Sequence, residues 1–148
     1  MFKRIIFSTI AIVMICGGPI GLARADDQAA AVEQVKQAKL AADAWLKLVD
    51  DGNDQESWNQ LATVVKPMVS EEKWAQKAAA VRKLMGPVIS RNFKAGKYST
   101  TLPGAPDGHY VVIQYDSSFA NKKSTVEEVV PMLDTDGQWR VSGYHFVM

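Results

Sequence analysis

The residues most able to do chemistry in this sequence are charged side chains within segments rich in strand-forming residues. They are Arg91, Glu127, Glu128 and Arg140, which alternate with apolar neighbours. Burying an unpaired charge is costly, so an acid that faces the interior of the fold needs an arginine partner. Two interpretations stay open: an ion pair on a solvated face of the sheet, or a pocket lining in which Arg91 takes an anion.

The pocket interpretation predicts a set of ligand-binding residues with polar or aromatic side chains on the strands. The set is Arg91, Tyr98, Tyr115, Glu128, Tyr144 and His145. The alternation of a strand does not by itself decide whether Glu127 or Glu128 faces the cavity. We assign no catalytic residue from the sequence.

Metal chemistry has little support in the sequence. Neither His109 nor His145 stands at a ligand spacing from another strong ligand. The string Asp134-Thr-Asp-Gly137 is similar to the start of a calcium loop, but the later ligand positions are missing, which favours a tight turn. Nucleophile-elbow, zinc-protease and phosphate-loop motifs are also missing from the sequence. We therefore expect no metal and no cofactor.

The first half of the chain predicts three helices. Residues 27–51 are Ala-rich and contain neither Gly nor Pro, which favours a helix. A second helix is expected between residues 53 and 67, and a third between residues 70 and 86, each bounded by capping or breaking residues. Each helix carries a tryptophan on its apolar stripe, which predicts core packing rather than an aromatic binding site. These are Trp45, Trp58 and Trp74.

The second half predicts an antiparallel sheet. Four segments rich in β-formers are separated by turn residues, namely 88–100, 110–116, 125–133 and 138–148. Strict alternation along the last segment places Val141 and His145 on one face and Tyr144 on the other. Pro131 indicates an edge strand or a bulge, and an edge there would offer a homodimer interface. The segment 101–109, rich in Pro and Gly, is expected either to set the hairpin register or to line a site.

This order of elements predicts an α+β fold. N-terminal helices would pack on one face of a curved four-stranded antiparallel sheet. Residues 26–148 have the length of a single domain, and we find neither an internal repeat nor a linker.

The N-terminal segment predicts export. Lys3 and Arg4 precede an apolar run that ends at Cys16, and Ala23-Arg-Ala25 is typical of a cleavage site. We expect residues 1–25 to be a cleaved Sec signal peptide, which makes the protein periplasmic or secreted and leaves no stable membrane anchor. The alternatives are a retained anchor or lipidation at Cys16. The rest of the chain is slightly acidic, which gives no case for a nucleic-acid partner.

Three strings carry a resemblance to a known family. They are Ser57-Trp-Asn59, Leu102-Pro-Gly-Ala-Pro-Asp-Gly108 and Asp136-Gly-Gln-Trp-Arg-Val-Ser-Gly-Tyr144. With them the sequence resembles a bacterial family of exported domains of unknown function (DUF 4019 type). The layout is also similar to the cone-shaped fold of nuclear transport factor 2 (NTF2-like) and cystatin-like proteins. The resemblance implies no established activity, since relatives of that cone fold include both enzymes and interaction modules.

Two functions are compatible with these features. We expect an exported binding or interaction module for an unknown small ligand, peptide or envelope protein, without established catalytic activity. The alternative is a cone-fold enzyme of the isomerase or hydrolyase type, with His145 or His109 as the base and Tyr144 assisting.

Overall fold

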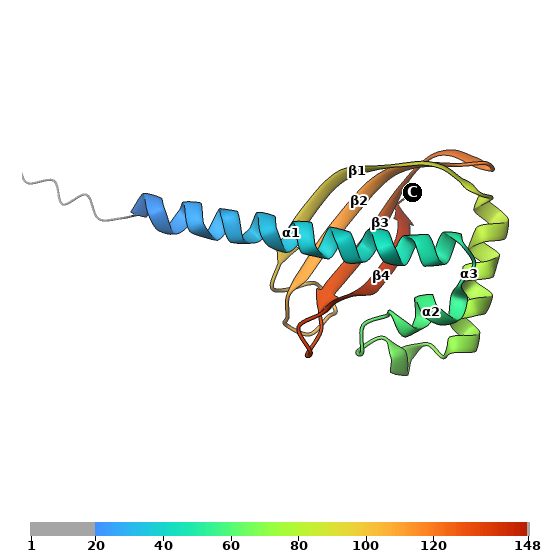
Figure 1. The fold of residues 1–148 in the computed structure, drawn as a ribbon, viewed down its shortest axis with the longest axis horizontal. Helices are drawn as coiled ribbons and strands as arrows, with labels where there is room; N and C mark the ends of the chain where they lie inside the picture. Colours follow the sequence, from blue (N-terminus) through green and yellow to red (C-terminus); the bar gives the residue numbers. More distant parts are fainter. Residues whose placement is uncertain (1–19, 148) are drawn as a thin grey trace, which may run out of the picture.

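The computed structural model of the chain describes residues 20–147 (Figure 1). Three helices precede a four-stranded sheet, as expected for an α+β fold, and the long first helix lies across one face of that sheet. The basic and apolar parts of the predicted leader fall outside the described residues. The predicted cleavage position, after Ala25, falls in the first turns of the first helix.

The second half of helix α1 (Ile20–Asp50) packs on the sheet and contributes residues to the hydrophobic core. This half buries small and large apolar residues at three- and four-residue spacing, which is the pattern of a helix packed on a sheet. These are Ala38, Ala42, Trp45, Leu46 and Val49. Gly96 in the first strand lies directly against this helix, because a Cβ added there would lie 2.6 Å from Cγ1 of Val35. The missing side chain thus permits the close approach of helix and sheet.

Helix α2 (Asp54–Asn59) is shorter than the sequence predicts, and the expectation of a helix up to Pro67 is wrong. The chain leaves the helix because Leu61 forms a bridge with Val141 and the backbone amide of Ala62 donates to the Val141 carbonyl at 2.9 Å. A 3₁₀ turn follows (Lys66–Met68). Pairing with a strand edge thus outweighs the local helical pattern.

Helix α3 (Glu71–Met85) follows the predicted signals. The Ser70 hydroxyl accepts a hydrogen bond from the Lys73 amide at 3.3 Å, and Gly86 ends the helix with φ 73°. Its buried residues are Ala78 and Met85. Helices α2 and α3 pack together at one end of the sheet (Figure 1).

The tryptophans on the three helices belong to the core, as the sequence predicts. Trp45 is buried, and Trp58 and Trp74 pack against the core cluster. Two of them bind one residue of α2: the indole of Trp45 donates to the Ser57 carbonyl and that of Trp74 to the Ser57 hydroxyl, both at 2.8 Å. Their polar ends therefore fasten α1 and α3 to α2.

The four strands form one antiparallel sheet in chain order. They are β1 (Val88–Ser99), β2 (Tyr110–Phe119), β3 (Lys122–Leu133) and β4 (Trp139–Val147). The predicted meander is thus confirmed. Pro131 lies in β3, between β2 and β4, so the edge interpretation of this proline is wrong and the bulge interpretation is right, because the register shifts between Val130 and Pro131.

Because of the same bulge, the faces predicted for the residues of β4 are wrong. Val130 pairs with Gly143 and Pro131 with Val141, so Ser142 is the extra residue and the alternation reverses there. Val141 and Tyr144 therefore both pack against the core cluster under the helices. His145 lies on the opposite face with its side chain 56 % exposed. Strict alternation fails because one unpaired residue moves every later side chain to the other face.

Candidate ligand-binding site

A buried ion cluster lies between α1 and the sheet. Nε and Nη2 of Arg91 donate to the Glu127 carboxylate at 2.6 and 3.0 Å. Nη1 and Nη2 donate to Asp50 of α1 at 2.6 and 3.1 Å. Glu127 is fully buried, whereas Asp50 is partly open to water. Glu127, not Glu128, is therefore the acid that faces the helices.

Glu127 has two further partners. The hydroxyls of Ser117 and Tyr144 donate to its two oxygens, the latter at 2.8 Å. Burial, together with the adjacent Glu127 charge, raises the pKa of Tyr144 above its usual range. Within the described residues every buried side-chain polar atom has a hydrogen-bond partner. The cluster is thus fully satisfied by protein groups.

Arg91 is consequently not open to an anion. Its Nε and both terminal nitrogens are engaged by carboxylates. Burial works to lower the Arg91 pKa, but the hydrogen bonds that Arg91 donates to Asp50 and Glu127 outweigh it and raise the pKa above its ordinary value. The ion-pair interpretation therefore describes this residue, with the difference that the pair is buried rather than solvated.

The six residues predicted for ligand binding separate into three groups. Arg91, Tyr115 and Tyr144 face the helices, where Tyr115 donates to Asp43 at 2.6 Å. Glu128 and His145 lie together on the outer face, their carboxylate and Nε2 3.2 Å apart. Tyr98 stacks on His109, with ring centroids 5.9 Å apart, and its hydroxyl hydrogen-bonds to Nδ1. The structure does not bring the six into one pocket.

The largest hollow near these residues lies between α3 and the ends of β3 and β4, and we call it the α3–β4 groove. Its volume is about 580 Å³. It is lined by Val81, Leu84, Met85, Asn121, Lys122, Thr125, Tyr144, His145 and Phe146. The walls are mainly apolar, and Leu84 is 74 % exposed there. The residue pattern does not predict this hollow, and the one signal for it is Leu84 beside the buried stripe of α3.

The junction between α3 and the β2–β3 hairpin forms part of the wall of the α3–β4 groove. The amides of Ala120 and Asn121 donate to the carbonyls of Pro87 and Met85, each at 2.9 Å. Gly86 makes this junction possible, because a Cβ there would lie 3.1 Å from Ala120 Cβ and from Asn121 side-chain atoms. Backbone hydrogen bonds therefore fix the position of the hairpin relative to α3 at this part of the groove.

A second hollow connects the groove region to the ion cluster. It has a volume of about 340 Å³ and lies between α1, α3 and the sheet. It shares Val81, Met85 and Tyr144 with the α3–β4 groove and reaches Asp50. Tyr144 thus has its ring between the two hollows and its hydroxyl on Glu127.

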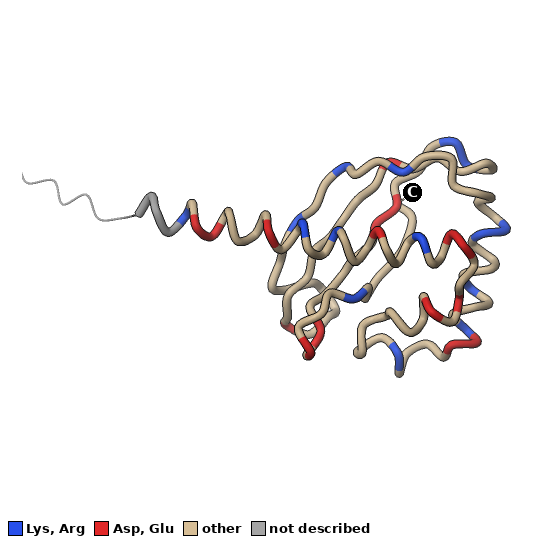
Figure 2. The backbone as a smooth tube through the Cα atoms, in the orientation of Figure 1, with Lys and Arg blue, Asp and Glu red and all other residues tan. Residues whose placement is uncertain are grey.

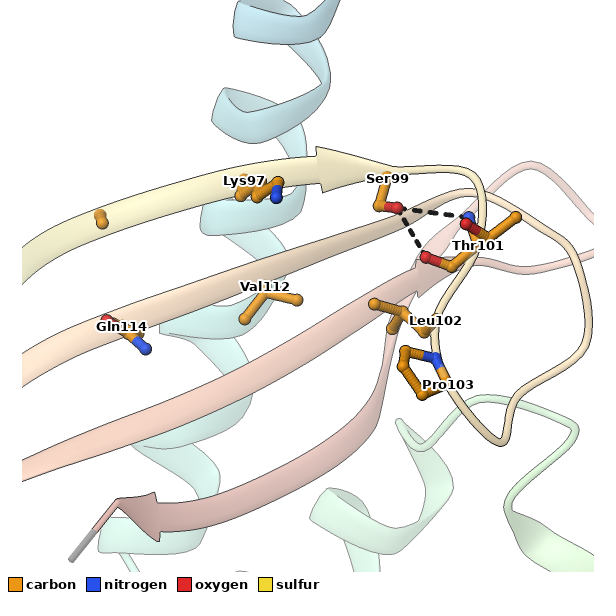
Figure 3. A pocket seen from close by; sticks show the side chains of 8 residues that line it. Lys97, Ser99, Thr101, Leu102, Pro103, Val112 and Gln114 are labelled. Carbon is orange, nitrogen blue, oxygen red and sulfur yellow. Dashed lines mark hydrogen bonds between the residues drawn. The ribbon is translucent and has the colours of Figure 1, made fainter.

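Two other hollows are smaller than the α3–β4 groove and have more polar walls than it has. One, about 460 Å³, lies between α1 and β1 and is lined by the paired charges of Asp43, Asp50 and Arg91. The other, also about 460 Å³, lies on the outer face of the sheet beneath the Pro-Gly segment. Figure 3 shows Leu102 and Pro103 of that segment lying near Val112 of β2. The segment therefore folds over the sheet face that the helices leave open.

The family of the chain follows from comparison with known sequences. Residues 41–144 match the family model described as "Protein of unknown function (DUF4019)". The chain belongs to this family. The match includes the second half of α1, all of α3 and β4 as far as Tyr144, so it contains most of the α3–β4 groove. No curated protein and no solved structure matches the chain.

Two further searches concern residues 20–147. No group of three or more His, Cys, Asp or Glu side chains in this range could hold a metal ion. No helix in the same range combines the length and the apolar character needed to cross a membrane.

Proposed function

We propose that this protein is an exported, non-catalytic binding module that holds an apolar ligand in the α3–β4 groove. The observation that carries the proposal is the contrast between this groove and its surroundings. Its walls are mainly apolar and open to solvent, whereas the charged groups behind it are already paired with one another. Ligand sites of this size are commonly apolar with a few polar groups.

The export part of the proposal rests on the N-terminal sequence. A basic start, an apolar run and a small-residue cleavage site are typical of a signal peptide. The comparison with the cone-shaped NTF2-like or cystatin-like fold rests on the order of helices and strands alone. Neither is needed for the binding proposal, which depends on the groove.

The enzyme alternative is less well supported. A histidine base acts best where water is excluded and a substrate can reach it. His145 lies at the rim of the groove, but its side chain is 56 % exposed and it pairs with Glu128 on the outer face. His109 stacks on Tyr98 far along the sheet from α3. Neither position provides a shielded base.

A neutral apolar dye tests the proposal. Nile red added to the mature protein, purified after export without residues 1–25, should bind and increase in fluorescence. Leu84→Asp should abolish most of the increase, because it places a charge in the apolar wall. Ile89→Asp is the matched control, since Ile89 is similarly exposed, at 69 %, and lies outside the groove. Equal binding by both variants, or no binding by the wild type, would contradict the proposal.

A further inference from the structure

We propose that the occupant of the α3–β4 groove is a free fatty acid, with its chain along α3 and its carboxylate at the β2–β3 hairpin. This inference rests on the proposed function and names the ligand class. It depends on the apolar walls, on the location of the polar groups and on the sign of the charge among them.

The apolar walls suit a single flexible chain. Val81 and Leu84 lie about one turn apart on α3, and Phe146 lies on the strand side. Met85 lies between this groove and the second hollow, and an unbranched thioether adapts readily to the shape of a ligand. Highly polar ligands would leave these walls without matching contacts.

The polar groups of the lining lie where the carboxylate end of the fatty acid would lie. Asn121, Lys122 and Thr125 all come from the β2–β3 hairpin and the start of β3. The side-chain amide of Asn121 donates to the Leu84 carbonyl at 3.3 Å, which helps to hold the hairpin against α3. The Lys122 ammonium and the Thr125 hydroxyl are donors suited to a carboxylate.

The charge at this end is positive. The lining contains Lys122 but no Asp or Glu. Like Lys97 and Lys123, Lys122 takes part in none of the ion pairs among the described residues. Figure 2 also shows basic residues on the β2–β3 hairpin and on the later part of α3. An anionic head group therefore complements the groove better than a neutral or cationic one.

Competition against Nile red tests the head group directly. Decanoate and decanol share one apolar chain and differ in charge, so both are titrated below the concentrations at which they aggregate. Decanoate should displace the dye at roughly fivefold lower concentration than decanol at low salt. The advantage should shrink as salt is added, because the rim charge is exposed.

Two lysines provide a matched pair of variants. Lys122→Glu should weaken decanoate binding about tenfold and leave decanol unchanged. Lys123→Glu makes the same charge change one residue away, outside the lining, and should have less than about a threefold effect. Equal displacement by decanoate and decanol, or equal effects of the two variants, would overturn the fatty acid while the groove remained a site. Failure of Nile red itself to bind would instead remove the proposed function.

Discussion

The Arg91 guanidinium binds the Glu127 carboxylate through two hydrogen bonds, from Nε at 2.6 Å and from Nη2 at 3.0 Å. This pair joins β1 to β3 across β2, and Asp50 adds α1 to the same guanidinium. The polar groups behind the proposed ligand site therefore have a structural role. They hold the helix on the sheet and leave recognition to the groove.

Breaking this pair should destabilise the fold strongly. Arg91→Met leaves Glu127 charged and fully buried, which should lower the free energy of unfolding by about 3–5 kcal/mol. Arg91→Met combined with Glu127→Leu removes both members of the pair and should recover part of that loss, because the hydroxyls of Ser117 and Tyr144 then lose their acceptor. Urea denaturation of the two variants gives the comparison. A double variant no more stable than Arg91→Met would contradict the role assigned to the pair.

The buried tyrosines should make the fold sensitive to alkaline pH. Burial and then the neighbouring carboxylates, Asp43 and Glu127, raise the pKa values of Tyr115 and Tyr144 in the folded state. In the unfolded chain these phenols ionise near pH ~10. Their contribution to stability is therefore complete below about pH 10 and is lost as the pH rises above it.

The measurement is the free energy of unfolding as a function of pH. Between about pH 9 and 11 it should fall more steeply for the wild type than for the Tyr115→Phe, Tyr144→Phe double variant. At neutral pH, Tyr144→Phe alone should cost about 2 kcal/mol, because Glu127 loses a donor in a fully buried site. Equal slopes for the two proteins would refute the assignment.

Gly86 should be required for the junction between α3 and the β2–β3 hairpin. Its φ of 73° and ψ of −178° are almost restricted to glycine, and an added Cβ would meet Ala120 and Asn121. Gly86→Ala should cost about 3 kcal/mol and weaken Nile red binding. Gly104→Ala is the control, because φ is 77° there and nothing lies within 4 Å of an added Cβ, so its cost should be about 1 kcal/mol. Equal costs would show that the junction is not tightly packed.

The order of elements could be predicted from the sequence because local signals agree with the fold. Ser70 and Gly86 bound α3 as capping preferences predict, and the four strands follow their β-forming segments. Helix α2 was mispredicted because its end is decided by the bridge between Leu61 and Val141, two residues far apart in the sequence. Such long-range pairing leaves no local signal in a single sequence.

The site was harder to predict than the fold. A one-residue bulge at Ser142 decides that Tyr144 faces the helices and His145 does not. Pro131 and Gly143 mark the region of the bulge, but neither indicates which residue of β4 is the extra one. Arg91 attracted attention as an anion site, but its partner Asp50 comes from a distant helix. The α3–β4 groove depends on the packing of α3 against the β2–β3 hairpin, which is a tertiary property.

Backbone amide chemical shifts recorded during a titration with Nile red test the central claim most directly. We predict that the shifts change mainly at the groove-lining positions of α3, the β2–β3 hairpin and the end of β4, with Leu84, Lys122 and Phe146 among them. Changes centred instead on the outer sheet face around Val112 and Pro103, or no localised changes, would contradict the assignment of the ligand site to the α3–β4 groove.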